Sequence, residues 1–315
     1  MTSDYEVILR NGERKFTALS NFHEKDVFCK PSERKWNRIV LFLHGFPDNN
    51  KSFSELRHYL KDEFGRKDQP LFLSPAMRGY EPSSQGNDSE YGLHQISTDI
   101  YAWIEQLKNG QNIPVHLVGH DWGALCSFKA ASNWPGLITS MACLAIPYLA
   151  NIRIWELLYY CPEQLYLSSY MLTMQSSLIY TKKLLGADGG DYLADLWGYW
   201  SPTWNIPSSA LEDVKYTLRQ PGVVDGATAY YRCMFKPLAF SDRRWPVDFD
   251  YTPTLILGGS EDGCMSRRLY DLEKRKLKDV KTARVKLMPG IGHFLHREDP
   301  QKVAQSIGEW FAIHK

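Results

Sequence analysis

Six short apolar runs, separated by stretches with helical periodicity, limit the possible folds of this chain more than any other feature. Continuous runs of this length are typical of strands that are buried on both faces of a parallel sheet. The stretches 96–107 and 303–311 each keep one apolar face at helical spacing. Strands that alternate with helices predict an α/β fold with a mostly parallel, doubly wound sheet. The six runs are residues 39–43, 71–73, 115–118, 141–146, 255–257 and 285–287.

Two further strand-like stretches, residues 5–9 and 16–19, precede the first apolar run. They lie on either side of Asn11-Gly12, and an Asn-Gly pair is a strong signal of a tight hairpin turn. We therefore expect antiparallel strands ahead of the parallel sheet. At the other end of the chain, Asp299-Pro300 has the residue types of a helix N-cap and a first helical residue, so the last helix is expected to begin there.

The alternation of strands and helices breaks between about residues 150 and 246. This region is rich in tyrosine and tryptophan and mostly helical in pattern, and strand signals return only at Thr254. We expect residues 1–149 and 247–315 to form the core and residues 150–246 to form a helical cap. Such a cap would lie above the carboxyl ends of the strands, where open α/β sheets bind their ligands.

Charge and cysteine usage exclude several classes of partner. The chain has 37 Lys and Arg against 36 Asp and Glu, with no sustained basic patch, so we expect no nucleic-acid partner. No window approaches the roughly 18 uninterrupted apolar residues of a membrane span, and the N-terminus lacks a signal-peptide pattern. The six cysteines are scattered, which favours reduced thiols over disulfides or a metal site. We expect a cytoplasmic location and a protein that needs no metal or cofactor. The sequence does not indicate the oligomeric state.

The chemistry begins at Gly119-His120-Asp121-Trp122-Gly123, between the 115–118 run and a helix-like stretch. A strand, a sharp turn flanked by glycines and a helix make the setting of a nucleophile elbow. The two glycines allow the close backbone approaches that such a turn needs. The middle residue, Asp121, would then project into the site. A carboxylate is suited to attack an electrophilic sp3 carbon, so the pattern indicates either the opening of an epoxide or the displacement of a halide.

A carboxylate nucleophile forms an ester, and its hydrolysis requires a base and a group that orients the base. Asp262 follows the 255–257 run and His293 follows the 285–287 run, so both are expected at the same edge of the sheet. The order nucleophile, acid, histidine is that of α/β-hydrolases. Glu261 is an alternative to Asp262, and His296 to His293; the spacing favours Asp262 and His293.

Ester hydrolysis also places negative charge on the Asp121 carboxyl group, and two backbone N–H groups are needed to stabilise it. Trp122, directly after the nucleophile, offers one of them. Phe46, in the His44-Gly45-Phe46-Pro47 loop after the 39–43 run, offers the other. These two residues form the expected oxyanion hole, and His44 is expected to brace the loop.

These motifs resemble those of epoxide hydrolases of the α/β-hydrolase superfamily, and the similarity spans nearly the whole chain. Residues 43–48 are similar to the family's oxyanion-hole motif, 77–80 to its arginine-glycine-tyrosine turn, 119–123 to its elbow and 290–293 to its histidine loop. The resemblance implies an α/β-hydrolase fold with an inserted cap and no cofactor. The same motifs occur in dehalogenases.

The resemblance further implies two cap tyrosines that bind and protonate the epoxide oxygen. Tyr170 stands five residues before Gln175, as the first tyrosine of the family does, although Met174 replaces a common phenylalanine. Tyr231 forms the family's tyrosine-arginine pair with Arg232. An alkoxide leaving group needs an acid whereas a halide does not, so the pair favours epoxide chemistry. Together with Phe46 and Trp122, the two tyrosines are the expected substrate-binding residues.

We expect an epoxide hydrolase that makes a vicinal diol from a small apolar epoxide. Two alternatives remain. A haloalkane or haloacid dehalogenase could use the same Asp121, His293 and Asp262. Haloalkane enzymes usually carry an asparagine at the position of Phe46, and fluoroacetate enzymes usually carry an arginine at the position of Trp122, which weighs against both. The other alternative is a non-catalytic binding protein with an α/β-hydrolase fold.

Overall fold

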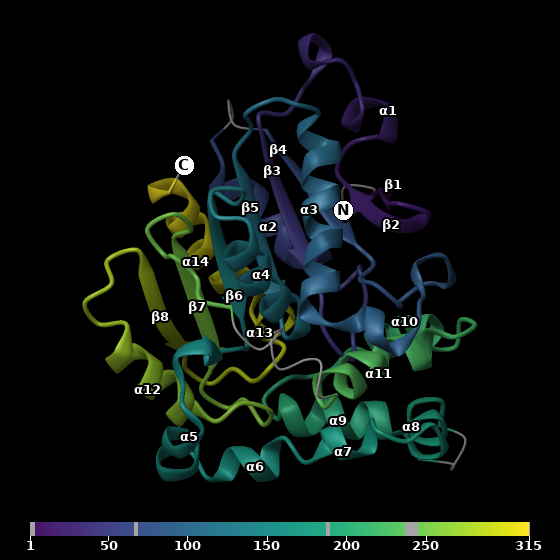
Figure 1. The fold of residues 1–315 in the computed structure, drawn as a ribbon, viewed down its shortest axis with the longest axis vertical. Helices are drawn as coiled ribbons and strands as arrows, with labels where there is room; N and C mark the ends of the chain where they lie inside the picture. Colours follow the sequence, from purple (N-terminus) through teal and green to yellow (C-terminus); the bar gives the residue numbers. More distant parts are fainter. Residues whose placement is uncertain (1–3, 66–68, 187–189, 237–244, 315) are drawn as a thin grey trace.

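The computed structural model describes residues 4–65, 69–186, 190–236 and 245–314. Within these ranges the chain forms an eight-stranded sheet with the order β1-β2-β4-β3-β5-β6-β7-β8 (Figure 1). The pairs from β4 through β8 are parallel, so the predicted α/β fold is confirmed. The strands are β1 (Tyr5–Asn11), β2 (Arg14–Ser20), β3 (Arg38–Leu43), β4 (Pro70–Pro75), β5 (Val115–His120), β6 (Ser140–Leu144), β7 (Thr254–Gly259) and β8 (Ala283–Met288).

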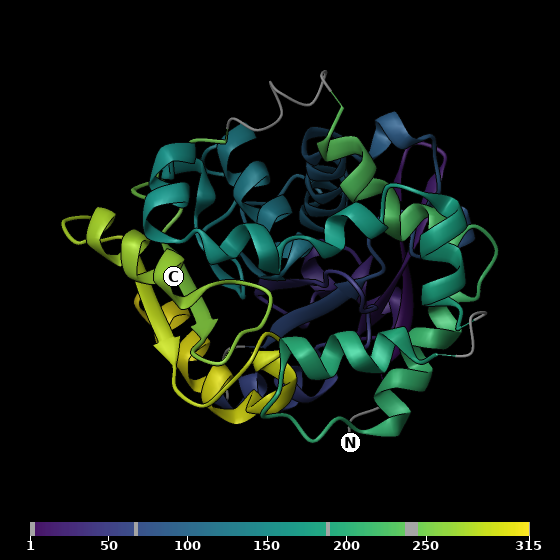
Figure 2. The same ribbon diagram turned by 90° about the horizontal axis from the view of Figure 1, so that it is seen from below.

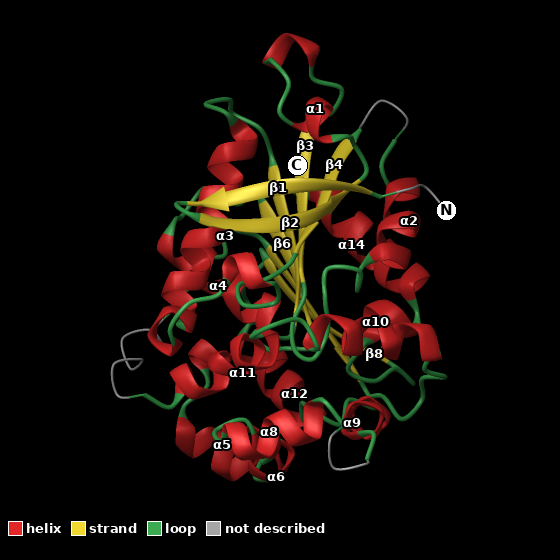
Figure 3. Ribbon diagram, turned by 90° about the vertical axis from the view of Figure 1, so that its right-hand side faces the viewer, coloured by secondary structure: helices red, strands yellow, loops and turns green. Residues whose placement is uncertain are grey.

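Helices cover both faces of the sheet, and each face has its own apolar core (Figure 3). Helices α3, α4 and α12 pack on one face, while α2 and α14 pack on the other. Outside the insertion between β6 and β7, the helices are α1 (Glu24–Val27), η1 (Pro31–Glu33), α2 (Ser54–Glu63), η2 (Pro82–Ser84), η3 (Asp88–Tyr91), α3 (Leu93–Lys108), α4 (Trp122–Asn133), α12 (Arg267–Lys276), α13 (Leu295–Glu298) and α14 (Pro300–Ile313).

The antiparallel start of the sheet agrees with the Asn-Gly signal. β1 and β2 pair from Tyr5 with Ser20 to Asn11 with Arg14, and Gly12 in the turn has a φ of 58°. β2 then joins β4 in antiparallel fashion. The last helix also begins as expected, because the Asp299 side chain accepts a hydrogen bond from the Lys302 N–H at 3.1 Å.

The prediction that every apolar run is buried on both faces was wrong for one strand. All residues of β3, β4, β5, β6 and β7 are buried, whereas β8 lies at the edge of the sheet and alternates in exposure. Val285 is buried but its neighbour Lys286 is exposed. An edge strand needs only one apolar face, and the sequence already carries this alternation, because Lys286 separates Val285 from Leu287.

A run of helices is inserted in the chain between the paired strands β6 and β7, and Figure 2 views the molecule from below, from the side of these helices. None of the helices in the described ranges is long and apolar enough to cross a membrane. The division into a core and a cap at residues 150 and 246 remains a prediction. The inserted helices are η4 (Leu149–Asn151), α5 (Ile154–Tyr160), α6 (Glu163–Leu167), α7 (Tyr170–Thr173), α8 (Ser177–Leu184), α9 (Tyr192–Trp200), α10 (Ser208–Leu218) and α11 (Val223–Met234).

Candidate active site

Asp121 occupies a sharp turn between β5 and α4. Its φ of 51° and ψ of −118° are unusual for a residue with a side chain, and its N–H donates to the carbonyl of Leu144 at 3.1 Å. The flanking glycines are required by close contacts. A Cβ atom on Gly123 would lie 1.9 Å from the carbonyl oxygen of Leu43. A Cβ atom on Gly119 would lie 2.4 Å from the carbonyl oxygen of Gly123. The backbone therefore has the form of a nucleophile elbow.

One oxygen of the Asp121 carboxylate is held by a backbone N–H group. The Phe46 N–H donates to Oδ1 at 2.8 Å, and the N–H of the next residue, Trp122, also favours the charged form of the carboxylate. The loop lies so close that a Cβ on Gly45 would be 2.4 Å from Oδ1, and the Phe46–Pro47 peptide bond is cis. The predicted oxyanion-hole residues thus meet at the nucleophile, and Oδ2 is left facing His293.

His293 and Asp262 lie side by side in the loops after β8 and β7. His293 Nδ1 is 3.0 Å from Asp262 Oδ2 and 3.2 Å from Oδ1. The acid is itself oriented, because Oδ1 accepts hydrogen bonds from the N–H groups of Cys264 at 2.7 Å and Met265 at 2.9 Å. His293 Nε2 lies 3.9 Å from Asp121 Oδ2, which is too long for a hydrogen bond. The structure therefore brings the three predicted residues together with the imidazole between the two carboxylates.

Burial and charge shift the pKa values of this group. Burial raises the pKa of Asp121 to about 6, although His293 and the N–H groups of Phe46 and Trp122 oppose the shift. Burial alone would lower the pKa of His293, but the charges of Asp262 and Asp121 outweigh it and raise the pKa. A carboxylate with a pKa near 6 is ionised at neutral pH and more basic than an exposed one, which suits a nucleophile.

The two predicted tyrosines meet across the site from different helices, Tyr170 at the start of α7 and Tyr231 in α11. Their hydroxyl oxygens are 3.4 Å apart. The ring of Tyr231 packs edge-on against Phe46 and Trp122, with centroid separations of 5.2 and 5.1 Å. Burial, reinforced by the charge of Asp121, raises the pKa of both phenols well above 10. Both tyrosines therefore carry their protons at neutral pH.

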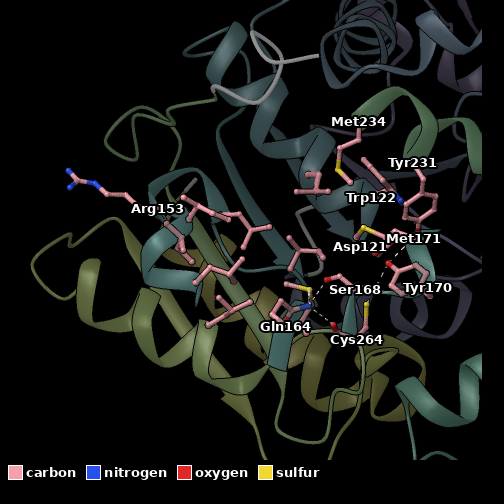
Figure 4. A pocket seen from close by; sticks show the side chains of 18 residues that line it. Asp121, Trp122, Arg153, Gln164, Ser168, Tyr170, Met171, Tyr231, Met234 and Cys264 are labelled. Atoms are coloured by element: carbon pink, nitrogen blue, oxygen red, sulfur yellow. Dashed lines mark hydrogen bonds between the residues drawn. The ribbon is translucent and has the colours of Figure 1, made fainter. Parts of the chain in front are cut away.

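A cavity of about 360 Å³ contains these groups. Asp121, Trp122, Tyr170 and Tyr231 lie together in its wall, whereas the guanidinium group of Arg153 extends away from them (Figure 4). Apolar side chains make up most of the remaining wall, so the cavity suits an apolar ligand. They are Leu125, Ile146, Leu149, Ile152, Ile154, Leu157, Met171, Met234, Met265 and Leu269.

The structure separates the predicted residues from their alternatives. His296 Nε2 lies 2.6 Å from the hydroxyl of Ser52, so this ring faces a different group from Asp262. Glu261 is exposed, and its carboxylate accepts a hydrogen bond from the Ser260 hydroxyl. Neither alternative therefore occupies the place of His293 or Asp262 beside Asp121.

Other histidines near the site are structural. His44 Nε2 accepts a hydrogen bond from the Met77 N–H at 3.0 Å, so it braces the oxyanion loop as expected. His116 is buried inside β5. His120, next to the nucleophile, uses its Nε2–H to donate to the His293 carbonyl at 3.0 Å. This bond supports the position of the histidine loop.

Asp48, His120 and His296 form a buried cluster whose possible ligand atoms lie within 4.8 Å of one another. The Asp48 carboxylate and His296 Nε2 have protein partners already. The Ser52 hydroxyl donates to Asp48 at 2.5 Å and lies 2.6 Å from His296, while Arg297 pairs with the Asp48 carboxylate at 2.6 Å. Because the guanidinium group would repel a cation, the cluster is better described as a buried ion-pair network.

Sequence reasoning missed two residues that line the cavity. The Cys264 thiol donates to the Tyr170 hydroxyl at a sulfur–oxygen distance of 3.8 Å. The Gln164 amide of α6 donates to the Cys264 carbonyl at 2.9 Å and accepts from the Ser266 N–H at 2.8 Å. Cys264 could have been noticed because it lies only two residues after Asp262. Gln164 carried no such signal, because it belongs to a short helix without a clear periodicity.

The C-terminal end of α9 joins three loops of the site. The Trp200 carbonyl accepts hydrogen bonds from the N–H groups of His293 at 3.0 Å and Gly263 at 3.1 Å. The Trp197 indole N–H donates to the Pro47 carbonyl at 3.1 Å. One inserted helix therefore fixes the histidine loop, the acid loop and the oxyanion loop relative to one another.

Comparison with known proteins agrees with this geometry. A family model described as "Alpha/beta hydrolase family" matches residues 40–306. Mouse epoxide hydrolase 3 is 27% identical over 271 residues, covering 85% of this chain and 68% of the relative. Epoxide hydrolase 2 of Caenorhabditis elegans is 26% identical over 300 residues, covering 94% and 79%. The crystal structure of an epoxide hydrolase from Vigna radiata superimposes with a TM-score of 0.73 at 19% identity and covers 98% of each chain. The similarity to epoxide hydrolases predicted from the motifs is confirmed.

Proposed function

This chain belongs to the alpha/beta hydrolase family, and from that premise we propose that it is an epoxide hydrolase that forms a vicinal diol through an ester on Asp121. One observation carries the proposal. Two protonated phenols, with hydroxyl oxygens 3.4 Å apart, line the same cavity as a carboxylate nucleophile. An epoxide needs both a nucleophile and a proton donor, and this arrangement supplies both.

We further propose that residues 1–149 and 247–315 supply the triad and the N–H donors, and that the cap of residues 150–246 adds the tyrosines. The substrate is a small apolar epoxide, because the 360 Å³ cavity has a mainly apolar wall. A cytoplasmic location is supported by the six cysteines, all of which are free thiols.

In the first step, Asp121 Oδ2 attacks one carbon of the epoxide ring. The new carbon–oxygen bond forms as the old ring bond breaks, and the electron pair of that bond moves to the epoxide oxygen. Tyr170 and Tyr231 hydrogen-bond this oxygen, and one of them gives it a proton. Oδ1 remains with the N–H group of Phe46 and becomes the carbonyl oxygen of the ester.

In the second step, His293 Nε2 removes a proton from water, and the water oxygen bonds to Cγ of Asp121. Asp262 orients the imidazole and stabilises its charged form. Negative charge collects on Oδ1, where the N–H groups of Phe46 and Trp122 stabilise it. The Cγ–Oδ2 bond then breaks, and the diol leaves with a proton from His293. The remaining proton on the Asp121 carboxyl restores the tyrosine, so one water and one epoxide give one diol.

The decisive test is removal of the nucleophile. We expect Asp121→Ala to lose all measurable hydrolysis of a panel of small epoxides, and we expect His293→Gln to accumulate an ester on Asp121. Mass spectrometry of the peptide that contains residue 121 would detect the added substrate mass. Epoxide turnover by purified Asp121→Ala would overturn the proposal.

The tyrosines distinguish epoxide opening from halide displacement. Because proton donation contributes roughly 10²–10⁴ to a rate, we expect Tyr170→Phe with Tyr231→Phe to reduce kcat for epoxides by about a thousandfold. Tyr230→Phe is a matched control, since this neighbour is buried and donates to the Arg78 carbonyl at 2.8 Å, away from the cavity wall. Halide release from alkyl halides that survives in the double variant, without epoxide turnover by the wild type, would instead identify a dehalogenase.

A further inference from the structure

An exposed apolar patch covers the outer side of α5 and α6. Six large side chains in these helices, only a few residues apart in sequence, are each at least half exposed. Water-soluble proteins rarely leave such a group of apolar side chains uncovered unless it contacts a partner. We name this group the cap rim patch. It consists of Ile154 (68% exposed), Trp155 (54%), Leu158 (50%), Tyr159 (76%), Leu165 (55%) and Tyr166 (73%).

The residue types of the cap rim patch match those of a membrane interface. Trp155, Tyr159 and Tyr166 combine an apolar ring with a polar N–H or O–H group, and such residues are enriched where lipid meets water. Ile154 with Leu158 and Trp155 with Tyr159 are spaced by four residues, so each pair lies on one side of α5. Figures 1 and 3 place α5 and α6 along the outer edge of the molecule, at the opposite end from α1.

The charges around the patch are complementary to an anionic surface. The carboxylates of α5 and α6 are both paired with bases of α12, Glu156 with Lys276 at 2.6 Å and Glu163 with Arg268 at 3.5 Å. The Arg275 guanidinium lies 5.4 Å from the centre of the Tyr160 ring at the end of α5. The exposed basic residues of α12 are Arg267, Arg268, Lys274 and Arg275, against one exposed acidic residue, Asp271.

The patch is continuous with the wall of the catalytic cavity. Ile154, whose side chain belongs to the patch, also lines the cavity that contains Asp121, as does Leu157 of the same helix. Arg153, directly before α5, lines the cavity with its stem and directs its guanidinium group away from it (Figure 4). A second copy of the chain seated on the patch would cover this wall, whereas a fluid lipid surface would supply apolar molecules to it.

We propose that the cap rim patch docks on an anionic lipid surface, with the apolar side chains among the acyl chains and the surrounding arginines at the headgroups. Apolar attraction and charge attraction are the two contributions that peripheral proteins combine for reversible binding. Docking brings the α5 wall of the cavity against the bilayer, so epoxides dissolved in lipid are the favoured substrates. This second consequence rests on the proposed epoxide hydrolysis, but docking itself does not.

The test is sedimentation of the full chain with vesicles of phosphatidylcholine alone or mixed with phosphatidylserine. We expect binding to the mixed vesicles that weakens with added salt, and a loss of about tenfold or more in affinity for Trp155→Glu with Tyr159→Glu. Tyr216→Glu with Tyr251→Glu is the matched control, because these tyrosines are 69% and 64% exposed but lie outside α5 and α6. Arg153→Gln with Arg275→Gln should reduce binding about fivefold per charge, and only on the anionic vesicles.

Three results would overturn docking: wild-type protein that stays in the supernatant, binding that the Trp155 and Tyr159 substitutions leave unchanged, or an equal loss in the control. A dimer that dissociates in the Trp155 and Tyr159 variant, without vesicle binding, would assign the patch to a second copy instead. Thermal unfolding of each variant checks that it is folded.

Activity measurements separate docking from the proposed reaction. We expect the Trp155 and Tyr159 variant to retain wild-type turnover of a water-soluble epoxide and to lose turnover of a long-chain epoxide held in vesicles. If neither the wild type nor the variant opened any epoxide while they still differed in vesicle binding, the proposed reaction would fail and docking would stand. Equal turnover of the vesicle-held epoxide by wild type and variant would overturn delivery from the bilayer.

Discussion

The two oxygens of the Asp121 carboxylate have different surroundings, and this difference organises the site. Oδ1 accepts the Phe46 N–H at 2.8 Å, whereas Oδ2 faces His293 at 3.9 Å without a hydrogen bond. The oxygen that is not held is the one free to attack a substrate carbon. In the proposed ester hydrolysis, the held oxygen is already where charge must be stabilised, so no rearrangement is needed between the two proposed steps.

The pKa of Asp121 predicts the pH dependence of the first step. Since only the ionised carboxylate attacks and its pKa is about 6, we expect kcat/KM to fall tenfold per pH unit below that value. The pKa values of Tyr170 and Tyr231 lie well above 10, so no decline should occur on the alkaline side up to about pH 9. Stopped-flow or steady-state rates on a soluble epoxide would measure the profile. An alkaline limb below pH 9 would contradict the protonated state of the tyrosines.

At the residue scale, the sequence was sufficient to predict the site residues that directly follow strands. Asp121, Asp262 and His293 each follow an apolar run, and parallel strands deliver their carboxyl ends to one edge. The two tyrosines could be placed only by family resemblance, because no periodicity relates Tyr170 to Tyr231 across 61 residues. Cys264 was missed because a thiol contact with Tyr170 depends on how α7 packs above the acid loop.

Among the elements, the turn between β5 and α4 tolerates the least change. A Cβ on Gly123 would lie 1.9 Å from the Leu43 carbonyl oxygen of β3, so Gly123→Ala must push two packed elements apart. We expect this variant to lose about 3 kcal/mol of unfolding free energy or to fail to fold. Gly198→Ala in α9 is the control, because nothing lies within 4 Å of the added atom. It should gain up to about 1 kcal/mol.

Denaturant unfolding of the two glycine variants would measure this difference. A Gly123→Ala protein as stable as the wild type would show that the elbow can relax away from β3.

The lengths of the elements explain which of them could be predicted from the sequence. The strands and the long helices α3 and α14 have enough turns for a clear periodicity, whereas α6 and α7 have only five and four residues, fewer than two turns.

At the scale of the whole molecule, a buried carboxyl group links the end of the sheet to α12. Glu273 is fully buried, and its Oε1 accepts the Tyr148 N–H at 2.6 Å just after β6. Burial raises the pKa of Glu273 from 4.5 to about 8. The folded state therefore binds this proton more tightly than the unfolded state does. The resulting stability is fully present below pH 4.5 and is lost as the pH rises through 8.

Glu273→Gln should remove this dependence, because the amide oxygen can still accept the Tyr148 N–H while the titrating proton is gone. Between pH 5 and 8 we expect the unfolding free energy of the wild type to fall, relative to the variant, by about 1.4 kcal/mol per pH unit. Urea unfolding at several pH values would measure the difference. Glu105→Gln, at an exposed position of α3, is the control with the same change of residue type. Parallel curves for wild type and Glu273→Gln would contradict a buried, neutral Glu273.

The arrangement of the inserted helices over the sheet could not be read from the sequence. The apolar runs predict the parallel strands because each strand is buried by its neighbours and by helices on both faces. The inserted helices instead meet the core through scattered hydrogen bonds, such as that from the Trp197 indole to Pro47, through ion pairs such as Arg232 with Asp88, and through aromatic contacts that follow no repeat. Their tyrosine and tryptophan content predicted a cap but not how its helices pack on the core.

The hydrogen bonds at the C-terminal end of α9 divide the insertion into one part whose sequence is constrained by the site and another whose sequence can change more freely. Since the Trp200 carbonyl holds both the histidine loop and the acid loop, α9 behaves as part of the catalytic frame although its sequence lies within the insertion. Helices α5, α6 and α7 contribute side chains to the cavity wall, whereas α8 packs on α9 and α11. A chimera that borrows residues 150–186 from a relative with a tyrosine at the position of Tyr170 should exchange substrate preference and keep catalysis. One that also replaces α9 would have to rebuild the triad's geometry.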